Sequence, residues 1–139
     1  MTAAHCLTME QANLEINGVT YPVLEGYRTP AADIAVLIVP NAPCPCAVVA
    51  IYPTQRDEQI SLVGYPFGIL QVVVDGRVQG RAYVEDAEYL ITTARAAPGM
   101  SGGGMFNAQG ELVGIISATD SYGFMTLVVE LFTQPMEIR

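Results

Sequence analysis

The sequence has no lysine and no tryptophan, and it contains a single histidine, His5. Its six basic residues are all arginines and stand against fourteen carboxylates, which gives a formal net charge of −8 at neutral pH. Nucleic-acid binding depends on cationic side chains that displace counterions from the phosphate backbone, and an anionic membrane surface attracts the same side chains. The composition therefore predicts neither nucleic acid nor an anionic membrane surface as a partner.

Charged residues are scarce at 14%, against about 25% in ordinary globular chains, whereas hydrophobic residues make up 51%. This balance excludes a disordered segment, which is poor in hydrophobic residues and rich in charge. The 139 residues suffice for one domain, or for two very small domains that share an interface.

An apolar stretch, residues 34–52, contains no charged side chain. Its centre holds Pro40, Pro43 and Pro45, and proline inside a helix removes a hydrogen bond and clashes with the preceding turn. We therefore expect no membrane-spanning helix here, but two buried strands, Ile34–Val39 and Ala47–Tyr52, around a proline-rich turn.

The three cysteines, Cys6, Cys44 and Cys46, allow at most one intrachain disulfide and leave a thiol unpaired. One residue between Cys44 and Cys46 is too short a spacing for the usual zinc knuckle. A structural zinc site needs four good ligands, and the chain has one histidine. The sequence therefore predicts no metal site.

Short apolar strands separated by turn residues account for most of the chain. Asn17-Gly18 is the strongest hairpin signal, and Asp75-Gly76 predicts a second hairpin. Strands at this spacing predict an all-β barrel or sandwich, with a helical turn expected only at 8–11 or at the C-terminus. Besides the two apolar strands already given, the expected strands are 14–16, 19–21, 60–63, 70–74, 77–84, 89–93, 105–106, 112–117 and 124–131.

The segment PGMSGGG, residues 98–104, places Ser101 between glycines. Glycine permits a sharp turn and leaves backbone N–H groups able to face an oxyanion. Three interpretations stay open on this segment alone: a serine nucleophile, a phosphate-binding loop and a glycine-rich hairpin turn of structural role. The phosphate loop lacks the Gly-Lys-Ser/Thr ending. The segment also fits the nucleophile elbow of an α/β-hydrolase esterase, but there the histidine follows the serine, and here none does.

Two other residues have the chemistry that a serine nucleophile requires. Taken alone, His5 is an ordinary surface or core histidine and Asp33 is a turn residue at a strand edge. However, Asp33 opens the apolar run 34–39, where a carboxylate must be paired or hydrogen-bonded. The order His5, Asp33, Ser101 along the chain is the chymotrypsin-type order of a catalytic triad.

On these motifs the chain resembles the trypsin/chymotrypsin-like serine peptidases, in particular the bacterial HtrA-like branch. The resemblance implies an all-β fold: a chymotrypsin-like double β-barrel in a single domain, with residues 1–55 in the N-terminal barrel and 56–139 in the C-terminal barrel. In that family three strands precede the TAAHC motif, so the first barrel is expected to be incomplete. The segments that carry the resemblance are TAAHC (2–6), DIAVLIV (33–39), GYPFGILQVVVDGRVQG (64–80), PGMSGGGMFNAQGELVGI (98–115) and ISAT (116–119).

The resemblance implies a serine endopeptidase that works through an acyl-enzyme. Ser101 would attack the scissile carbonyl, His5 would carry the proton, and Asp33 would orient the imidazole. The backbone N–H groups of Gly99 and Ser101 would form the oxyanion hole. Ser117 corresponds to the serine whose hydroxyl supports the catalytic aspartate.

The same resemblance implies how a polypeptide substrate would bind. The strand Ser117-Ala118-Thr119 would pair with an extended peptide as an added strand. Arg95 corresponds to the base of the primary specificity pocket, where a cation favours an acidic residue before the scissile bond. Arg95 could instead pair with Glu88 or turn to solvent. No metal and no organic cofactor is implied.

Several positions depart from the family pattern. Met100 stands where the family has Asp or Asn, so a side-chain hydrogen bond that helps to set the oxyanion loop is expected to be lost. Gly104 stands where proline is usual, which loosens the following turn. Cys6 would pair with an upstream cysteine in the family, so it is expected to be unpaired here.

The incomplete barrel leaves strand edges that favour pairing with another chain, so a homo-oligomer is expected. It also supports an alternative function, a catalytically incompetent pseudopeptidase that acts as a peptide-binding module. Members of the family often work outside the cytoplasm, which favours a periplasmic or secreted location, although no signal peptide is visible.

Overall fold

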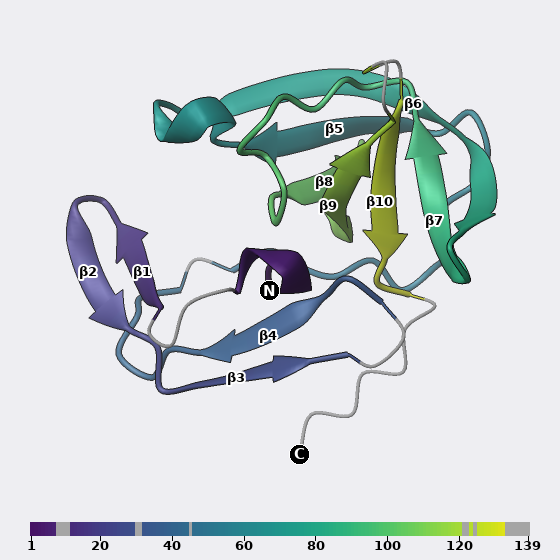
Figure 1. Ribbon diagram of the computed structural model, residues 1–139. Helices are drawn as coiled ribbons and strands as arrows, with labels where there is room; N and C mark the ends of the chain where they lie inside the picture. The colour runs from purple at the N-terminus through teal and green to yellow at the C-terminus, as the bar shows by residue number, and fades with distance from the viewer. Residues whose placement is uncertain (8–11, 30–31, 45, 121–122, 124, 133–139) are drawn as a thin grey trace.

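The structure, a computed structural model, describes residues 1–7, 12–29, 32–44, 46–120, 123 and 125–132. This part of the chain contains strands and two 3₁₀ turns but no α-helix, which confirms the all-β prediction. In chain order the elements are η1 (Ala4–Cys6), β1 (Asn13–Ile16), β2 (Val19–Pro22), β3 (Glu25–Arg28), β4 (Ala35–Ile38), β5 (Gln59–Gly64), η2 (Pro66–Gly68), β6 (Val72–Val84), β7 (Ala87–Thr92), β8 (Gly104–Asn107), β9 (Leu112–Thr119) and β10 (Thr126–Glu130) (Figure 1).

Strands β5 to β10 close into a barrel in the order β10-β7-β6-β5-β8-β9, with antiparallel neighbours. Side chains alternate between its inside and outside, as along β5, where Ile60 and Leu62 are buried and Ser61 is not. Burial of these apolar side chains fills the barrel and stabilises it. The buried residues of this hydrophobic core include Ile60, Leu62, Val78, Leu90, Met100, Met105, Val113, Ile116 and Val128.

Strands β1 to β4 form two separate two-stranded sheets: in Figure 1, β3–β4 lies below the barrel and β1–β2 lies to its lower left. Asn17 and Gly18 have positive φ (51° and 80°), so the predicted Asn-Gly hairpin between β1 and β2 is confirmed. The described residues before β5 do not close into a barrel. The prediction of an incomplete first barrel is therefore confirmed.

A small apolar cluster joins this open half to the barrel. Ala3 and Ile34, both fully buried, pack with Ile115, Val129 and Leu131 of the barrel side. The backbones of residues 2 and 35 also exchange two hydrogen bonds, of 2.9 and 2.8 Å. The segments that carry His5 and Asp33 are thus anchored beside the barrel, although strands β1, β2 and β3 are largely exposed.

The expected buried strand Ala47–Tyr52 is wrong. This stretch forms only an isolated parallel bridge to the barrel, in which Ala50 N–H donates to the Leu112 carbonyl. Val48 and Ile51 are exposed, and Ala50 alone packs inward. The segment is apolar, but a single bridge does not make it a strand of the sheet, so it crosses the barrel surface as a connection between the two halves.

No helix in the described segments is long and apolar enough to cross a membrane.

The predicted hairpin at Asp75-Gly76 is also wrong, because β6 continues without interruption from Val72 to Val84. Gly76 pairs with Ile60 in the ladder, and a β-carbon on it would lie 2.5 Å from the Ala94 backbone nitrogen. The glycine therefore permits a close approach of two backbones, not a turn. The actual turn between β6 and β7 is Glu85-Asp86, where both residues have positive φ.

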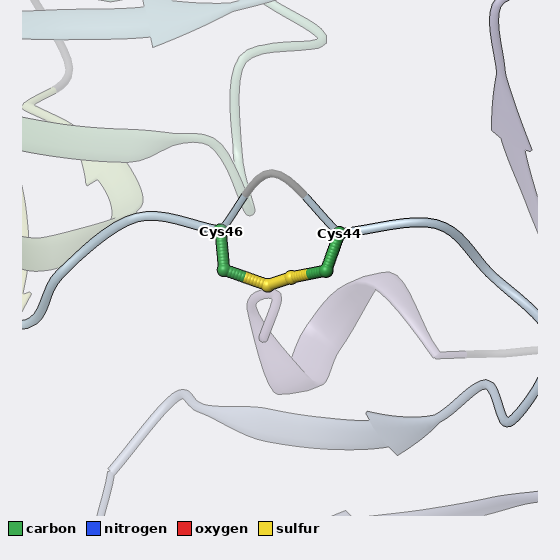
Figure 2. The surroundings of a disulfide bond; sticks show 2 residues. All are labelled: Cys44 and Cys46. Carbon is green, nitrogen blue, oxygen red and sulfur yellow. A yellow bond between two sulfur atoms is a disulfide. The ribbon is translucent and has the colours of Figure 1, made fainter.

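The remaining expectations are met to different degrees. Strand β3 was not predicted from the sequence, and the helical turns expected at 8–11 and at 133–139 lie outside the described residues. Cys44 and Cys46 are joined as a disulfide in the proline-rich connection (Figure 2), and Cys6 has a free, exposed thiol. One disulfide and one free thiol agree with the prediction from the cysteine count.

Candidate active site

The structure brings His5 and Asp33 into direct contact. Asp33 lies two residues before β4, next to the buried Ile34, and His5 lies on η1, two residues after the buried Ala3. Oδ2 of Asp33 is 2.5 Å from Nδ1 of the His5 imidazole, and Oδ1 accepts the His5 backbone N–H at 2.8 Å. The carboxylate therefore fixes both the backbone and the ring of His5.

A third donor comes from the barrel, because the Ser117 hydroxyl on β9 donates to Oδ2 of Asp33 at 2.7 Å. Partial burial of Asp33 would raise its pKa. The hydroxyl of Ser117, together with the backbone N–H and imidazole of His5, outweighs that effect and holds the pKa of Asp33 below its usual range. Asp33 is thus a stable carboxylate with three hydrogen bonds: two hold His5, and the third, from Ser117, connects the open half to the barrel.

Ser101 lies in the loop between β7 and β8, where residues 99–103 make a tight bend. Gly102 N–H donates to the Ile116 carbonyl at 2.8 Å, and Ile116 N–H donates to the Gly103 carbonyl at 2.9 Å. These bonds attach the bend to β9. Gly102 has φ +88°, and a β-carbon there would overlap the Thr2 hydroxyl, so the bend also packs against the chain just before His5.

The Ser101 hydroxyl donates to the Ser117 carbonyl at 3.0 Å. Within the part of the chain described, it makes no hydrogen bond to His5, whose side chain is 52% exposed. Hydrogen bonds between a nucleophile and its base are often long before substrate binds. The structure therefore brings Ser101 to the same site as the His5–Asp33 pair without joining Oγ to the imidazole.

Gly99 and Ser101 each carry a backbone N–H that donates to no acceptor among the residues described. Gly99 has φ +93°, and a β-carbon there would lie 2.7 Å from the Phe67 nitrogen. Phe67 N–H in turn donates to the Pro98 carbonyl at 2.9 Å. The η2 turn therefore supports the bend from outside and leaves two N–H groups available beside Ser101.

Beyond Ser101, the C-terminal end of β9 has one open edge. Strand β8 pairs with β9 only as far as Ile115, whereas β10 pairs with its other edge up to Thr119. Ser117 is buried, and Ala118 and Thr119 are exposed. Within the described ranges no strand covers the edge at 117–119, so it could accept an extended chain.

Arg95 lies in the segment that follows β7 and has an exposed side chain. Glu88, which the sequence offered as an alternative partner of Arg95, forms an ion pair with Arg81: its Oε1 lies 3.6 Å from Nε of Arg81.

The free thiol of Cys6 lies close to the bend, with Sγ 3.6 Å from the Ser101 carbonyl oxygen. Partial burial, followed by repulsion from the Asp33 carboxylate, raises the pKa of this thiol.

Among the described residues no group of three histidine, cysteine or acidic side chains could hold a metal ion.

The structure differs from the sequence expectation at Met100. Its thioether sulfur accepts the Ala97 N–H at 3.3 Å, so the side chain supplies a hydrogen bond where loss of one was expected. The contacts of Thr2 and Phe67 with the bend were not predicted either. Both lie within the motif segments 2–6 and 64–80, but adjacency across the fold has no local sequence signal.

Comparisons with known proteins show the family and the fold of the chain. The family model of the trypsin-like peptidase domain matches residues 1–115. The chain is 37% identical over 102 residues to a probable periplasmic serine endoprotease, DegP-like, of Pseudomonas savastanoi pv. phaseolicola, covering 68% of this chain and 21% of that protein. It is 35% identical over 116 residues to the protein of the same description from Ectopseudomonas mendocina, covering 78% and 24%.

Solved structures show the same fold. The active form of the Rv3671c protease from M. tuberculosis matches with a TM-score of 0.85 at 19% identity, over 94% of this chain and 63% of that one. The HtrA-type protease AlgW with a decapeptide matches with a TM-score of 0.82 at 21% identity, over 94% and 44%.

A six-stranded barrel beside a His-Asp pair and a serine bend is the architecture of a chymotrypsin-like domain. The chain belongs to the trypsin-like peptidase domain family, as the motifs predicted, and it is similar to DegP-like endoproteases in sequence and to an HtrA-type protease in fold. It spans about a fifth to a quarter of the length of the two DegP-like relatives, at 21% and 24%.

Proposed function

We propose that this chain is the peptidase domain of a serine endopeptidase and cleaves polypeptides through an acyl-enzyme. The observation that carries the proposal is the Asp33 carboxylate, which holds the His5 imidazole at 2.5 Å beside Ser101. A carboxylate in this position keeps the proton on Nδ1 and leaves Nε2 as the base.

In the proposed reaction, Oγ of Ser101 leaves the Ser117 carbonyl, turns to Nε2 of His5 and attacks the scissile carbonyl carbon. The imidazole takes the hydroxyl proton and then gives it to the leaving amine as the peptide bond breaks. Water, activated by the same imidazole, hydrolyses the acyl-enzyme and restores the Ser101 hydroxyl. Asp33 stabilises the imidazolium in both halves of the reaction.

The N–H groups of Gly99 and Ser101 are proposed to bind the oxyanion. Their availability in the described structure supports this role. Donors that are already oriented need no rearrangement when negative charge develops, and loss of one such donor typically costs about 10²–10³ in kcat.

The open edge of β9 at Ser117-Ala118-Thr119 is proposed to bind the substrate as an added strand. Arg95 is proposed to favour an acidic residue before the scissile bond. Chromogenic peptides ending in Glu, Leu and Ala should then be cleaved fastest when they end in Glu. Faster cleavage after Leu or Ala would exclude this role of Arg95.

The second candidate function is a peptide-binding module without catalysis. The observation in its favour is that Ser101 donates to the Ser117 carbonyl and not to His5 among the described residues.

The location and the assembly of the chain are separate proposals. The names of the relatives support an extracytoplasmic, periplasmic location for this chain. We further propose that the exposed edges of the open half allow a homo-oligomer to form.

The deciding experiment is the intact mass of the protein after incubation with a fluorophosphonate probe, for the wild type and for Ser101→Ala. One adduct on the wild type and none on the variant is the expected result, because only an activated serine reacts. An unlabelled wild type that still binds an extended peptide would favour the binding module. Labelling of both proteins would place the reactive group elsewhere.

A further inference from the structure

Met100 precedes the proposed nucleophile and is buried in the barrel core, with 1% of its surface exposed. It nevertheless takes part in three hydrogen bonds of the bend. Its sulfur accepts the Ala97 N–H at 3.3 Å, its own N–H donates to the Ala97 carbonyl at 3.1 Å, and its carbonyl accepts the Gly103 N–H at 2.9 Å.

The first two of these bonds form a closed ring between Ala97 and Met100, in which each residue donates one N–H to the other. This ring encloses the Pro98–Gly99 peptide, whose orientation decides where the Gly99 N–H points. The third bond holds the other side of the bend, immediately after Ser101. Met100 therefore holds the backbone on both sides of the two N–H groups, through two backbone hydrogen bonds and a third bond to its buried sulfur.

The side chain has little room to move from this position. A β-carbon on Gly64 would lie 3.1 Å from both Cβ and Cγ of Met100, so β5 packs directly against its stem. A side chain pressed between β5 and its own bend keeps its sulfur within reach of the Ala97 N–H.

We propose that Met100 is a positioning residue, whose thioether acceptor orients the bend that carries Ser101 and the N–H groups of the oxyanion hole. This inference rests on the proposed peptidase function for its catalytic consequence. It assigns to the thioether the task of a polar side chain: to satisfy the Ala97 N–H while the rest of the side chain fills the core as a hydrophobic group.

The test compares Met100→Leu with Met105→Leu. Met105 is the matched control, because it is equally buried in the same core and its sulfur has no hydrogen bond among the described contacts. Leucine retains the hydrophobic volume in both variants, but only at position 100 does it leave a backbone N–H without its acceptor. Two quantities are measured: hydrogen exchange of the Ala97 amide by NMR, and fluorophosphonate inactivation resolved into kinact and KI.

In Met100→Leu we expect faster exchange of the Ala97 amide, because its acceptor is lost. We also expect kinact to fall by about 5- to 50-fold, because Ser101 and the oxyanion N–H groups are displaced. KI should change little, because the open edge of β9 is intact. In Met105→Leu, both quantities should match the wild type.

An Ala97 amide that exchanges equally fast in the wild type and in Met100→Leu would contradict the sulfur acceptor. A faster exchange with kinact unchanged relative to Met105→Leu would contradict the positioning role. If the wild type itself reacts with no probe, the proposed function fails and the catalytic role with it, whereas the exchange comparison still decides whether the sulfur holds the bend.

Discussion

The two halves of this molecule are stabilised in different ways. The barrel of β5 to β10 encloses its own apolar core, whereas β1, β2 and β3 are exposed along nearly their whole length. The nucleophile candidate Ser101 belongs to the barrel, and His5 and Asp33 belong to the open half. The proposed site therefore depends on how well the weaker half is held against the stronger one.

The contacts between the halves are concentrated where the site is. Ala3 and Ile34 pack under the barrel strands, and each lies within two residues of a site residue. The Ser117 hydroxyl then ties the Asp33 carboxylate to β9. The open half needs no closed core of its own to position His5 and Asp33, because it uses the surface of the barrel for that purpose.

The largest loss of stability is expected from damage to the barrel wall at Arg81. This guanidinium donates to the buried Glu130 carboxylate at 2.6 and 2.8 Å and to the Thr54 carbonyl at 3.0 Å. Arg81→Met should lower the free energy of unfolding by about 3–5 kcal/mol, because removal of one partner weakens the compensation of a buried charge. Arg77→Met, on the same strand, removes a guanidinium that donates to the Asp57 carbonyl and, among the described contacts, to no buried carboxylate, so it should cost less than about 1 kcal/mol. Urea denaturation of both variants measures the difference, and equal losses would contradict this distinction between the two arginines.

A smaller loss of stability, but a large loss of activity, is expected from Ile34→Ala. This change removes a fully buried side chain from the cluster between the halves, at a cost of about 2–4 kcal/mol. Probe labelling of Ser101 should nearly disappear while the barrel amides stay protected from hydrogen exchange. Ile38→Ala, at a half-buried position of the neighbouring strand β4, is the control and should retain labelling. Loss of barrel protection in Ile34→Ala would show that the halves unfold as one unit.

Ser117→Ala should cost about 1–3 kcal/mol, because it removes a hydroxyl that donates to a carboxylate. The same hydroxyl lowers the pKa of Asp33, so its removal should raise that pKa. The stability that Asp33 contributes is present above its unfolded pKa and is lost as the pH falls through the folded value. The acid limb of the stability curve should therefore shift to higher pH in Ser117→Ala. Ser61→Ala, which removes the hydroxyl that donates to the exposed Asp75, should leave it in place. An acid limb that does not move would contradict the link between Ser117 and Asp33.

The smallest effect is expected at the exposed apolar residues of the open half and the connection. Leu24→Ser and Ile51→Ser should change the free energy of unfolding by less than about 0.5 kcal/mol, since both side chains already face solvent. Sedimentation equilibrium should show weaker self-association if exposed apolar surface drives it. A large loss of stability in either variant would mean that this surface is covered.

Local sequence signals predicted the structure correctly where no contact distant in sequence overruled them. The hairpin at Asn17-Gly18 formed as expected because its turn chemistry is local. At Asp75-Gly76 the same type of signal was overruled by a contact distant in sequence, the approach of Ala94 to Gly76. The apolar run 47–52 was interpreted as a buried strand, but no strand lies beside it to complete a ladder. Hydrophobicity indicates what can be buried and not what is available to cover it.

Motif order predicted the residues of the candidate site, and the structure brings His5, Asp33 and Ser117 together by hydrogen bonds. The order of motifs could not show the resting position of the Ser101 hydroxyl, since that depends on a rotamer and a neighbouring carbonyl. Nor could it show that the Met100 sulfur accepts a backbone N–H, because thioethers are weak acceptors and have no capping motif.

The most direct test of how the open half holds its histidine is the NMR spectrum of the imidazole, because His5 is the only histidine in the chain. In protein with ¹⁵N-labelled histidine we expect the imidazole proton to lie on Nδ1, where Asp33 holds it and protects it from exchange. Nε2 should then be the ring nitrogen without a proton. This signal should persist in Ser101→Ala and disappear in Asp33→Asn. An imidazole that exchanges between tautomers like free histidine, with no response to Asp33→Asn, would show that the open half does not hold its histidine against the barrel.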